Sequence, residues 1–403
     1  MMGNDIQSKK AIVLGADGNY MDKVETTIKS ICSHNTDIKF YIFNSDFPTE
    51  WFQLMNKRLS VLNSEVLNIK VTDDTISRFH LPTPHLSSAA YLRYFIPSFV
   101  FEKKVLYLDS DIIVTSNLTE LFNTSLDDYP LGAVPDFPIS NEEFNSGVLL
   151  IDTDMWRKEN ISEELFELTI AHHEHVYGDQ GIFNILFKDR WKHLDITYNL
   201  QVGQDAHRYY LGDYGWYDLF DGVPNIIHYT TENKPWKHYR FNRFRDIWWF
   251  YYGLNWNDVL LRTHVLKETF SELVSPSLKH VSIFTNTGDI ESIGYLLEKL
   301  PDVQFHIVAP TYFSPNIIEL QRYSNCYIYP CADPKMKQDI IDKTDIYLDI
   351  NYGPAMDQVL QEIVRQGKKI YSFDSTNHFS NGESTVFTVE EIDEFVREIE
   401  ERI

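Results

Sequence analysis

The sequence predicts an α/β protein with two domains, and three observations support this expectation. Through the first third of the chain, short apolar segments alternate with amphipathic segments, which predicts a mixed, mostly parallel sheet covered by helices. The alternation starts again after about Pro276. The 403 residues also exceed the length that a single hydrophobic core usually supports. We therefore expect a first domain at residues 1–275 and a smaller Rossmann-like α/β domain at residues 276–403.

The elements of the first domain follow from its apolar runs and their spacing. Segments with the apolar character of strands lie at residues 11–15, 39–44, 64–71, 105–114, 144–152 and 226–228. Helical spacing follows the first two strands, at residues 21–33 and 50–62, and another helix opens at Gly178. In such sheets, ligands bind beyond the carboxyl ends of the strands. The polar residues that follow the strands are therefore the candidates for function.

The second domain repeats a simpler pattern. Its expected strands lie at residues 281–285, 303–309, 326–330, 346–350 and 369–374. A helical segment follows each strand, the last at residues 389–402. No phosphate-binding loop and no paired metal donors accompany these elements, so we interpret this domain as a scaffold.

The composition limits the classes of partner. The formal net charge of −23 argues against nucleic acid and anionic membranes, which carry charge of the same sign. Cys32, Cys326 and Cys331 match no zinc spacing and suggest no disulfide framework, which fits a reducing compartment. No apolar run approaches the ~20 residues of a membrane span. We expect a soluble, cytoplasmic protein that does not bind nucleic acid.

Two aspartates are the most informative feature of the first domain. Residues 105–114 read Val-Leu-Tyr-Leu-Asp-Ser-Asp-Ile-Ile-Val, and side chains two positions apart lie on the same face of a strand. Asp109 and Asp111 are therefore expected to converge. Hard oxygen donors at the end of a strand suit a divalent cation that also holds a phosphate. Acidic residues also end strands as turn formers, so the pair alone does not decide the function.

Five motifs, in order along the chain, carry a resemblance to a known family. They are Ala16-Asp17-Gly18-Asn19-Tyr20, Ala90-Tyr91-Leu92-Arg93, Tyr107-Leu108-Asp109-Ser110-Asp111, Phe144-Asn145-Ser146-Gly147-Val148-Leu149, and Asp179-Gln180 with His228 and Lys234-Pro235-Trp236. Through them, residues 11–256 resemble glycosyltransferase family 8, the retaining GT-A enzymes that include bacterial galactosyltransferases and glycogenin. The resemblance implies a GT-A type catalytic domain that transfers a hexose from a UDP-sugar.

The resemblance also implies a metal site. A nucleotide sugar leaves as a diphosphate, so catalysis needs positive charge at the leaving group more than it needs a strong general acid. Asp109, Asp111 and His228 would supply two oxygens and one nitrogen, and an imidazole beside carboxylates favours Mn²⁺ over Mg²⁺ or Ca²⁺. Lys234 would place an ammonium on the same diphosphate. Without the motifs, we would interpret His228 as a histidine at the end of a strand that is hydrogen-bonded to backbone groups. Lys234 would be a solvated lysine in a loop.

Further residues match the positions at which the family binds its donor. These are Ala16, Asp17, Asn19 and Tyr20 for base and ribose, Ser110 beside the metal ligands, His85 and Arg93 near the donor, and Asp136, Asn145, Asp179 and Gln180 at the transferred sugar. Carboxylates and amides suit sugar hydroxyls, and a buried arginine requires an anionic or polar partner. The alternatives are that Asp17 and Asp179 are helix caps and that Asn145 is a turn former.

Retention at the anomeric carbon requires either a covalent intermediate or departure and attack on one face. The motif places Gln180, an amide and a poor nucleophile, near that face. By resemblance we expect front-face substitution, in which the leaving phosphate helps to deprotonate the acceptor hydroxyl. Asp179 as a transient nucleophile is the alternative. We expect galactose first and glucose second, from the resemblance alone.

The second domain resembles half of a GT-B enzyme, as in the add-on domains of streptococcal transferases that extend glycans on serine-rich repeat adhesins. That resemblance implies a glycan or glycoprotein acceptor. Two alternatives stay open: a non-catalytic glycan- or adhesin-binding partner of a transferase complex, and a transferase acting on lipid-linked glycans. The second arises because residues 234–252 interleave basic and aromatic side chains, which suits a membrane surface. We favour burial of these aromatics between the two domains.

Overall fold

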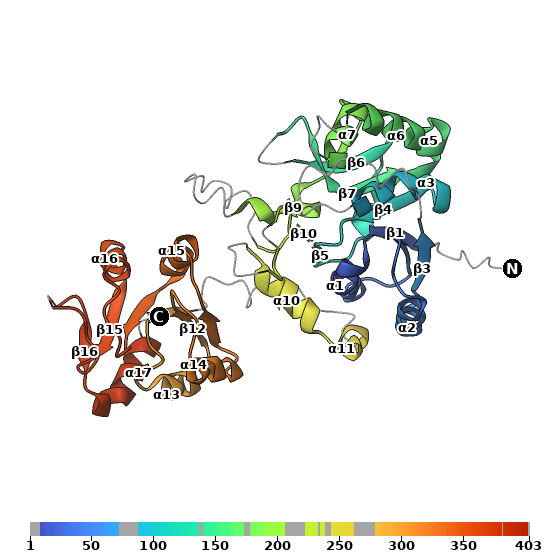
Figure 1. Ribbon diagram of the computed structural model, residues 1–403. Coiled ribbons are helices and arrows are strands. Elements are labelled where there is room, and N and C mark those ends of the chain that lie inside the picture. The colour runs from blue at the N-terminus through green and yellow to red at the C-terminus, as the bar shows by residue number, and fades with distance from the viewer. Residues whose placement is uncertain are drawn as a thin grey trace. The chain divides into compact units, whose positions relative to one another are not determined.

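The computed structural model describes residues 9–71, 88–136, 140–172, 178–205, 222–232, 234–237, 243–261, 279–380 and 382–401. The chain divides into two compact units, drawn in blue to yellow and in orange to red in Figure 1. The expected boundary after residue 275 falls within residues 262–278, outside the described part. The candidate donor residue His85 also lies outside it.

The first unit is built on a mixed, mostly parallel sheet of seven strands, ordered β3-β2-β1-β4-β7-β6-β8. The strands are β1 (Lys10–Gly15), β2 (Ile38–Asn44), β3 (Glu65–Lys70), β4 (Lys104–Leu108), β6 (Leu131–Pro135), β7 (Phe144–Asp152) and β8 (Lys192–His193). β7 runs antiparallel to both β4 and β6, whereas the other neighbours are parallel. The predicted fold class is confirmed for this unit.

Helices cover both faces of this sheet because successive strand residues point to opposite sides. In β1, Ile12 and Leu14 join a core with helices α1, α2 and α11, whereas Ala11 and Val13 join a core with α5, α6 and α7. The α-helices in the described part of the unit are α1 (Met21–Cys32), α2 (Thr49–Leu59), α3 (Ile96–Phe99), α4 (Thr119–Asn123), α5 (Thr153–Lys158), α6 (Ile161–His172), α7 (Gly178–Leu186), α10 (Arg245–Gly253) and α11 (Trp256–Leu261).

A second, three-stranded sheet lies within the same unit. It is ordered β5-β10-β9, with β5 at Ile112–Val114, β9 at Leu200–Gln201 and β10 at Ile226–His228. His228 pairs with Ile112 on one side and with Gln201 on the other. The end of β10 is therefore fixed beside the residues that precede β5.

The second unit is a doubly wound α/β domain. Its six strands pair in parallel in the order β13-β12-β11-β14-β15-β16, with bounds β11 (Lys279–Phe284), β12 (Val303–Val308), β13 (Cys326–Tyr329), β14 (Ile346–Asp349), β15 (Lys369–Phe373) and β16 (Thr385–Phe387). One core holds α13 (Ile293–Lys299), α14 (Pro315–Glu319) and α17 (Ile392–Glu401), and the other holds α15 (Pro334–Lys343) and α16 (Asp357–Arg365). The sequence missed β16 because Thr385 and Val386 are exposed, so this edge strand has no apolar run.

Two neighbouring histidines, the buried His306 and the half-buried His280, make the second unit sensitive to acid. His280 Nδ1 lies 3.0 Å from His306 Nε2, and His306 Nδ1 lies 2.8 Å from Tyr329 Oη. Burial, reinforced by Lys343, lowers the pKa of His280 to about 3 and that of His306 well below its ordinary 6.5. Both rings are therefore neutral in the folded unit and titrate near 6.5 once it unfolds.

We predict that this unit loses stability as the pH falls below about 6.5, by about 1.4 kcal/mol per pH unit for each proton that only the unfolded chain binds. Unfolding temperatures between about pH 7.5 and about pH 5 would measure this loss. A His280→Gln, His306→Gln variant should flatten the acid dependence, whereas the exposed His172→Gln should not. An unchanged slope in the double variant would contradict the assignment.

Candidate active site

The two aspartates lie in a turn between two strands and not along one strand. β4 ends at Leu108 and belongs to the large sheet, whereas β5 begins at Ile112 and belongs to the small sheet. Asp109 and Asp111 occupy the turn between them, so the expectation that they converge by strand alternation is wrong. They converge because the chain passes from one sheet to the other at this point.

The small sheet brings a histidine to this turn. His228 ends β10, and its Nε2 atom lies 3.6 Å from Asp109 Oδ2 and 3.3 Å from Asp111 Oδ1. One donor atom from each of the three residues lies within 4.8 Å of the others. Among the described residues, this is the one group of three or more acidic, histidine or cysteine side chains with the spacing of a metal site.

A chain of amides fixes the tautomer of His228. Asn145 Oδ1 accepts a hydrogen bond from the backbone N–H of Gly147 at 3.1 Å, so the orientation of this amide is set by the backbone. The same oxygen accepts from Asn199 Nδ2 at 2.9 Å, which leaves Asn199 Oδ1 to accept from His228 Nδ1 at 3.0 Å. The proton of a neutral His228 ring therefore resides on Nδ1, and the Nε2 lone pair faces the aspartates.

The same network extends to three of the candidate sugar-binding residues. Asn145 Nδ2 and the Ser146 backbone N–H both donate to Gln180 Oε1, at 3.1 and 3.2 Å. Gln180 Nε2 donates to Asp136 Oδ2 at 2.9 Å. Burial raises the pKa of Asp136, although the amides of Asn145 and Gln180 oppose the rise. These residues thus form one continuous hydrogen-bond network. It reaches Asp109, Asp111 and His228, which we call the metal-type cluster.

The cluster fits a divalent cation on three counts. Asp111 Oδ1 is buried and has no hydrogen-bond partner, which is costly unless a cation or another ligand satisfies it. The Nε2 lone pair of His228 points at carboxylate oxygens, an arrangement that a positive ion between them would stabilise. Two carboxylates and one imidazole are also ligands that Mn²⁺ accepts. We conclude that Asp109, Asp111 and His228 fit the metal implied by the sequence.

Lys234 lies at the same place. Its buried ammonium donates to Asp111 Oδ2 and, at 2.8 Å, to the carbonyl oxygen of Tyr229. Burial alone would raise the pKa of Asp111, but Lys234 and His228 hold it below its usual range. Asp111 is therefore ionised, as a metal ligand must be. The alternative of a solvated loop lysine is wrong, because Lys234 is 7% exposed.

Arg93 is held by carboxylates on two sides. Its Nη2 atom donates to Asp109 Oδ1 at 3.0 Å, and its Nε atom lies 3.1 Å from Asp179 Oδ2. Nη1 donates to the carbonyl oxygen of Ser146 at 2.5 Å, and the guanidinium lies 4.3 Å from the ring centre of Tyr107. Burial raises the pKa of Asp179, which Arg93 opposes. Arg93 therefore has the anionic partners that the sequence required, and it links a metal-type ligand to Asp179.

The loop after β1 is built as the capping alternative predicted. Asp17 Oδ1 accepts from the backbone N–H of Asn19 at 3.0 Å and caps the short helical turn Gly18–Tyr20. Ala16 is buried, and its N–H donates to the carbonyl oxygen of Phe43. These contacts explain the shape of the loop at the carboxyl end of β1.

Tyr20 connects this loop to the metal-type cluster. Burial, followed by the charges of Asp111, Asp17 and Asp109, raises the pKa of Tyr20 to about 12. Ser110, between the aspartates, has its hydroxyl 3.5 Å from the carbonyl oxygen of Gly15 at the end of β1. The loop and the cluster thus share one edge of the sheet, as expected for the carboxyl ends of parallel strands.

The aromatic segment near the end of the unit packs within that unit. In α10, Trp248 and Tyr251 are buried, and Tyr251 Oη lies 2.7 Å from Nε2 of His34, just after α1. These contacts join α10 to α1 within the first unit. The expectation of burial between the two domains stays a prediction. Trp249 and Tyr252 are 42% and 41% exposed. Within the described part of the chain, no helix is long and apolar enough to cross a membrane.

Sequence reasoning missed Asn199, which holds the Nδ1 proton of His228. No motif surrounds it, and only the pairing of β9 with β10 brings it beside His228. We predict that Asn199→Ala weakens Mn²⁺ binding by about 10- to 100-fold, the usual cost of losing the group that orients a metal-binding histidine. Calorimetric titration with Mn²⁺ in the presence of UDP would measure it. The exposed Asn123→Ala is the matched control, and equal affinities in both variants would refute the role.

A mixed sheet whose carboxyl edge carries Asp109 and Asp111, with His228 and Lys234 brought beside them, is the arrangement expected of a GT-A glycosyltransferase. Residues 11–239 match the family described as glycosyl transferase family 8, and residues 281–403 match the GftB/GlyA-F C-terminal domain. The chain belongs to glycosyltransferase family 8. It is therefore a transferase of that family with an additional C-terminal domain.

Several known proteins are similar along most of this chain. Glycosyltransferase GlyB of Streptococcus pneumoniae serotype 4 is 45% identical over 400 residues, which cover 98% of this chain and 99% of GlyB. GlyA of the same organism is 38% identical over 412 residues, but the match spans 56% of GlyA. The crystal structure of apo GlyE from S. pneumoniae TIGR4 covers 98% of this chain and 100% of its own, with 33% identity and a TM-score of 0.58.

A further solved enzyme resembles part of this chain. The crystal structure of the galactosyltransferase LgtC, in complex with donor and acceptor sugar analogues, covers 60% of this chain and 95% of LgtC. The identity is 25% and the TM-score is 0.53. The likeness supports the GT-A fold of the first unit.

Proposed function

We propose that this protein is a metal-dependent, retaining hexosyltransferase that uses a UDP-sugar and acts on a hydroxyl of a glycan acceptor. One observation carries the proposal: Asp109, Asp111 and His228 present their donor atoms within 4.8 Å of one another, with a buried, unpartnered oxygen on Asp111. We assign this chemistry to residues 1–275 and the Rossmann-like fold to residues 276–403.

Each candidate residue then has a role. When bound, Mn²⁺ would neutralise the diphosphate that leaves the sugar. Lys234 adds a second positive charge beside Asp111, and Tyr20 closes the donor side of the cluster. Ala16, Asp17, Asn19 and Ser110 shape the loops that receive the nucleotide. His85 is proposed near the donor from the motif alone.

The sugar side is lined by the amide network. Asp136, Asn145 and Gln180 hold one another in fixed orientation, which suits recognition of hydroxyl groups. Gln180 Oε1 already accepts two hydrogen bonds, so its proposed role is polar support of the reacting sugar in a front-face substitution. Asp179, buried beside Arg93, is the residue to test as a nucleophile.

The finer specificity rests on likeness. LgtC is described as a galactosyltransferase, which supports galactose before glucose as the donor sugar. The GlyB, GlyA and GlyE relatives are streptococcal, and the second unit resembles add-on domains of transferases that modify serine-rich adhesins. We therefore propose an O-linked glycan on such a protein as the acceptor.

Release of UDP from UDP-galactose and UDP-glucose, with and without Mn²⁺, tests the proposal. We expect turnover that requires the metal and is faster with galactose, and NMR of the released sugar or product should show retained anomeric configuration. No turnover by the wild-type chain with either donor, together with preserved glycan binding, would favour the non-catalytic binding partner instead.

A further inference from the structure

The second unit contains a hollow at the point where its strand order reverses. β12 and β13 lie on one side of β11, and β14, β15 and β16 lie on the other, so β11 and β14 flank the switch point of the parallel sheet. Ligands of doubly wound sheets bind in the crevice outside the carboxyl ends of the strands at such a point. The hollow lies beside this point, between the loop that follows β11 and helix α14, with Tyr352 from the loop after β14 at its edge. Its volume is about 660 Å³.

The two loops that form this hollow are tied to each other. The backbone N–H of Tyr352 donates to the carbonyl oxygen of Asp289 at 3.1 Å, and that of Glu291 donates to the carbonyl oxygen of Ile350 at 2.7 Å. These bonds join the loop after β11 to the loop after β14. The hollow is therefore shaped before any ligand arrives, as small-molecule sites usually are.

A buried carboxylate anchors the second loop from below. Asp349, at the end of β14, accepts from His378 Nδ1 at 2.8 Å and from the His378 backbone N–H at 2.6 Å. The other ring nitrogen of His378 lies 2.8 Å from the carbonyl oxygen of Gly353. The His378 ring thus lies between Asp349 and the carbonyl oxygen of Gly353, and it holds in place the loop that carries Tyr352.

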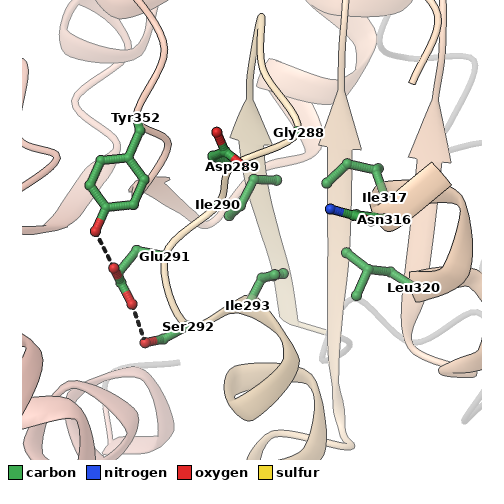
Figure 2. Close-up of a pocket in the computed structure, with 10 residues that line it drawn as sticks. All are labelled: Gly288, Asp289, Ile290, Glu291, Ser292, Ile293, Asn316, Ile317, Leu320 and Tyr352. Carbon is green, nitrogen blue, oxygen red and sulfur yellow. Dashed lines mark hydrogen bonds between the residues drawn. The ribbon is translucent and has the colours of Figure 1, made fainter. Parts of the chain in front are cut away.

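The polar side chains that line the hollow are either acidic or neutral, and none of them is basic. Figure 2 shows Tyr352, Glu291 and Ser292 joined by hydrogen bonds on one side, with Asn316 facing them across the hollow. Asp289 lies between them. The hydrogen bonds from Tyr352 and Ser292 lower the pKa of Glu291, so it stays ionised. None of the residues that line the hollow is lysine, arginine or histidine, so a phosphate would meet repulsion here.

The remaining lining is apolar and lies beneath these groups. It consists of Ile290, Ile293, Ile317 and Leu320, together with the small Gly288. A ligand for this hollow must therefore offer hydroxyl groups to carboxylate and amide side chains and an apolar face to aliphatic ones. A neutral sugar ring has both, and Tyr352, which is 51% exposed, adds an aromatic edge.

We propose that the hollow between the β11 loop and α14 binds an uncharged sugar of one or two residues. This site is separate from the metal-type cluster and requires no transfer chemistry. The resemblance of this unit to half of a GT-B enzyme would suggest a nucleotide, but the two carboxylates and the lack of a basic side chain in the lining favour a neutral glycan.

Saturation-transfer NMR and calorimetric titration of the full chain would test the site, with lactose, maltose and N,N′-diacetylchitobiose as probes. We expect at least one disaccharide to bind, and Glu291→Gln and Tyr352→Ala each to weaken its binding by about fivefold or more. The exposed Glu390→Gln, which makes the same charge change away from the hollow, should leave affinity unchanged. Unfolding temperatures show whether each variant is folded. If Tyr352→Ala does not fold, the result for Glu291→Gln alone decides the test.

Asp111→Asn separates this inference from the proposed function. It should reduce UDP-sugar turnover by about 10²- to 10³-fold or more and leave disaccharide binding intact. Loss of binding in an Asp111→Asn protein whose unfolding temperature shows that it is folded, unchanged binding in both hollow variants, or no binding by the wild type would overturn the site. Disaccharide binding in a wild-type protein that turns over no UDP-sugar would support the site and refute the transferase.

Discussion

Replacing Asp111 by asparagine should reduce sugar transfer by about 10²- to 10³-fold or more, the usual cost of removing one group that stabilises developing charge at an active site. Asp111 has two functions in this structure. Its Oδ1 atom faces His228 without a hydrogen-bond partner, and its Oδ2 atom neutralises the buried Lys234. Asparagine keeps the shape of the side chain but supplies neither the charge nor a second acceptor.

The same change should also lower stability, because it leaves Lys234 buried without its counter-ion. Breaking a buried ion pair by removing one partner costs about 3–5 kcal/mol. A readout independent of folding is therefore needed, and Mn²⁺ with UDP provides it. We expect the two together to raise the unfolding temperature of the wild type and not that of Asp111→Asn.

A double variant and a surface control complete this test. Asp111→Asn with Lys234→Met removes the uncompensated ammonium, so stability should recover while transfer stays lost. Asp128→Asn makes the same change on an exposed side chain and should alter neither property. Wild-type transfer by Asp111→Asn would remove the metal cluster from the mechanism.

Local sequence patterns predicted most of the fold. The apolar runs of β1, β2 and β7 are long and buried, so their positions could be read directly, and so could five of the six strands of the second unit. The break at Asp109 could not be predicted. Residues 105–114 are apolar on both sides of the aspartates, and only the partner strands, β7 for β4 and β10 for β5, assign the two halves to different sheets.

The candidate site shows the same division between local and long-range information. Asp109 and Asp111 were found from their spacing, and His228 and Lys234 through the family resemblance. The structure brings all four together. Asn199 was not found, because an asparagine before a two-residue strand has no local signature. Its importance arises from one hydrogen bond to a residue 29 positions away. The direction of the hydrogen bonds in the amide network fixes the tautomer of His228, and it too is set only in the folded chain.

Gly147 provides the sharpest test of how tightly the site is packed. A Cβ atom at this position would lie 2.1 Å from His228 Cε1 and 2.8 Å from Asp109 Oδ2, far inside normal contact distances. The backbone of β7 cannot easily move away from His228, because β7 is paired with β4 on one side and β6 on the other. The histidine ring and the Asp109 carboxylate must therefore shift away from Gly147, which disturbs the cluster and the hydrogen bond from His228 Nδ1 to Asn199.

We expect Gly147→Ala to reduce both Mn²⁺ affinity and sugar transfer by about 10²-fold or more, because small displacements of reacting groups cost rates of that size. Overpacking should lower the free energy of unfolding by only about 1–3 kcal/mol, so the variant should remain folded. Gly253→Ala is the matched control, since a Cβ there meets no atom within 4 Å. Normal metal affinity in Gly147→Ala would mean that the cluster tolerates a displaced imidazole, and His228 would then have no place among the ligands.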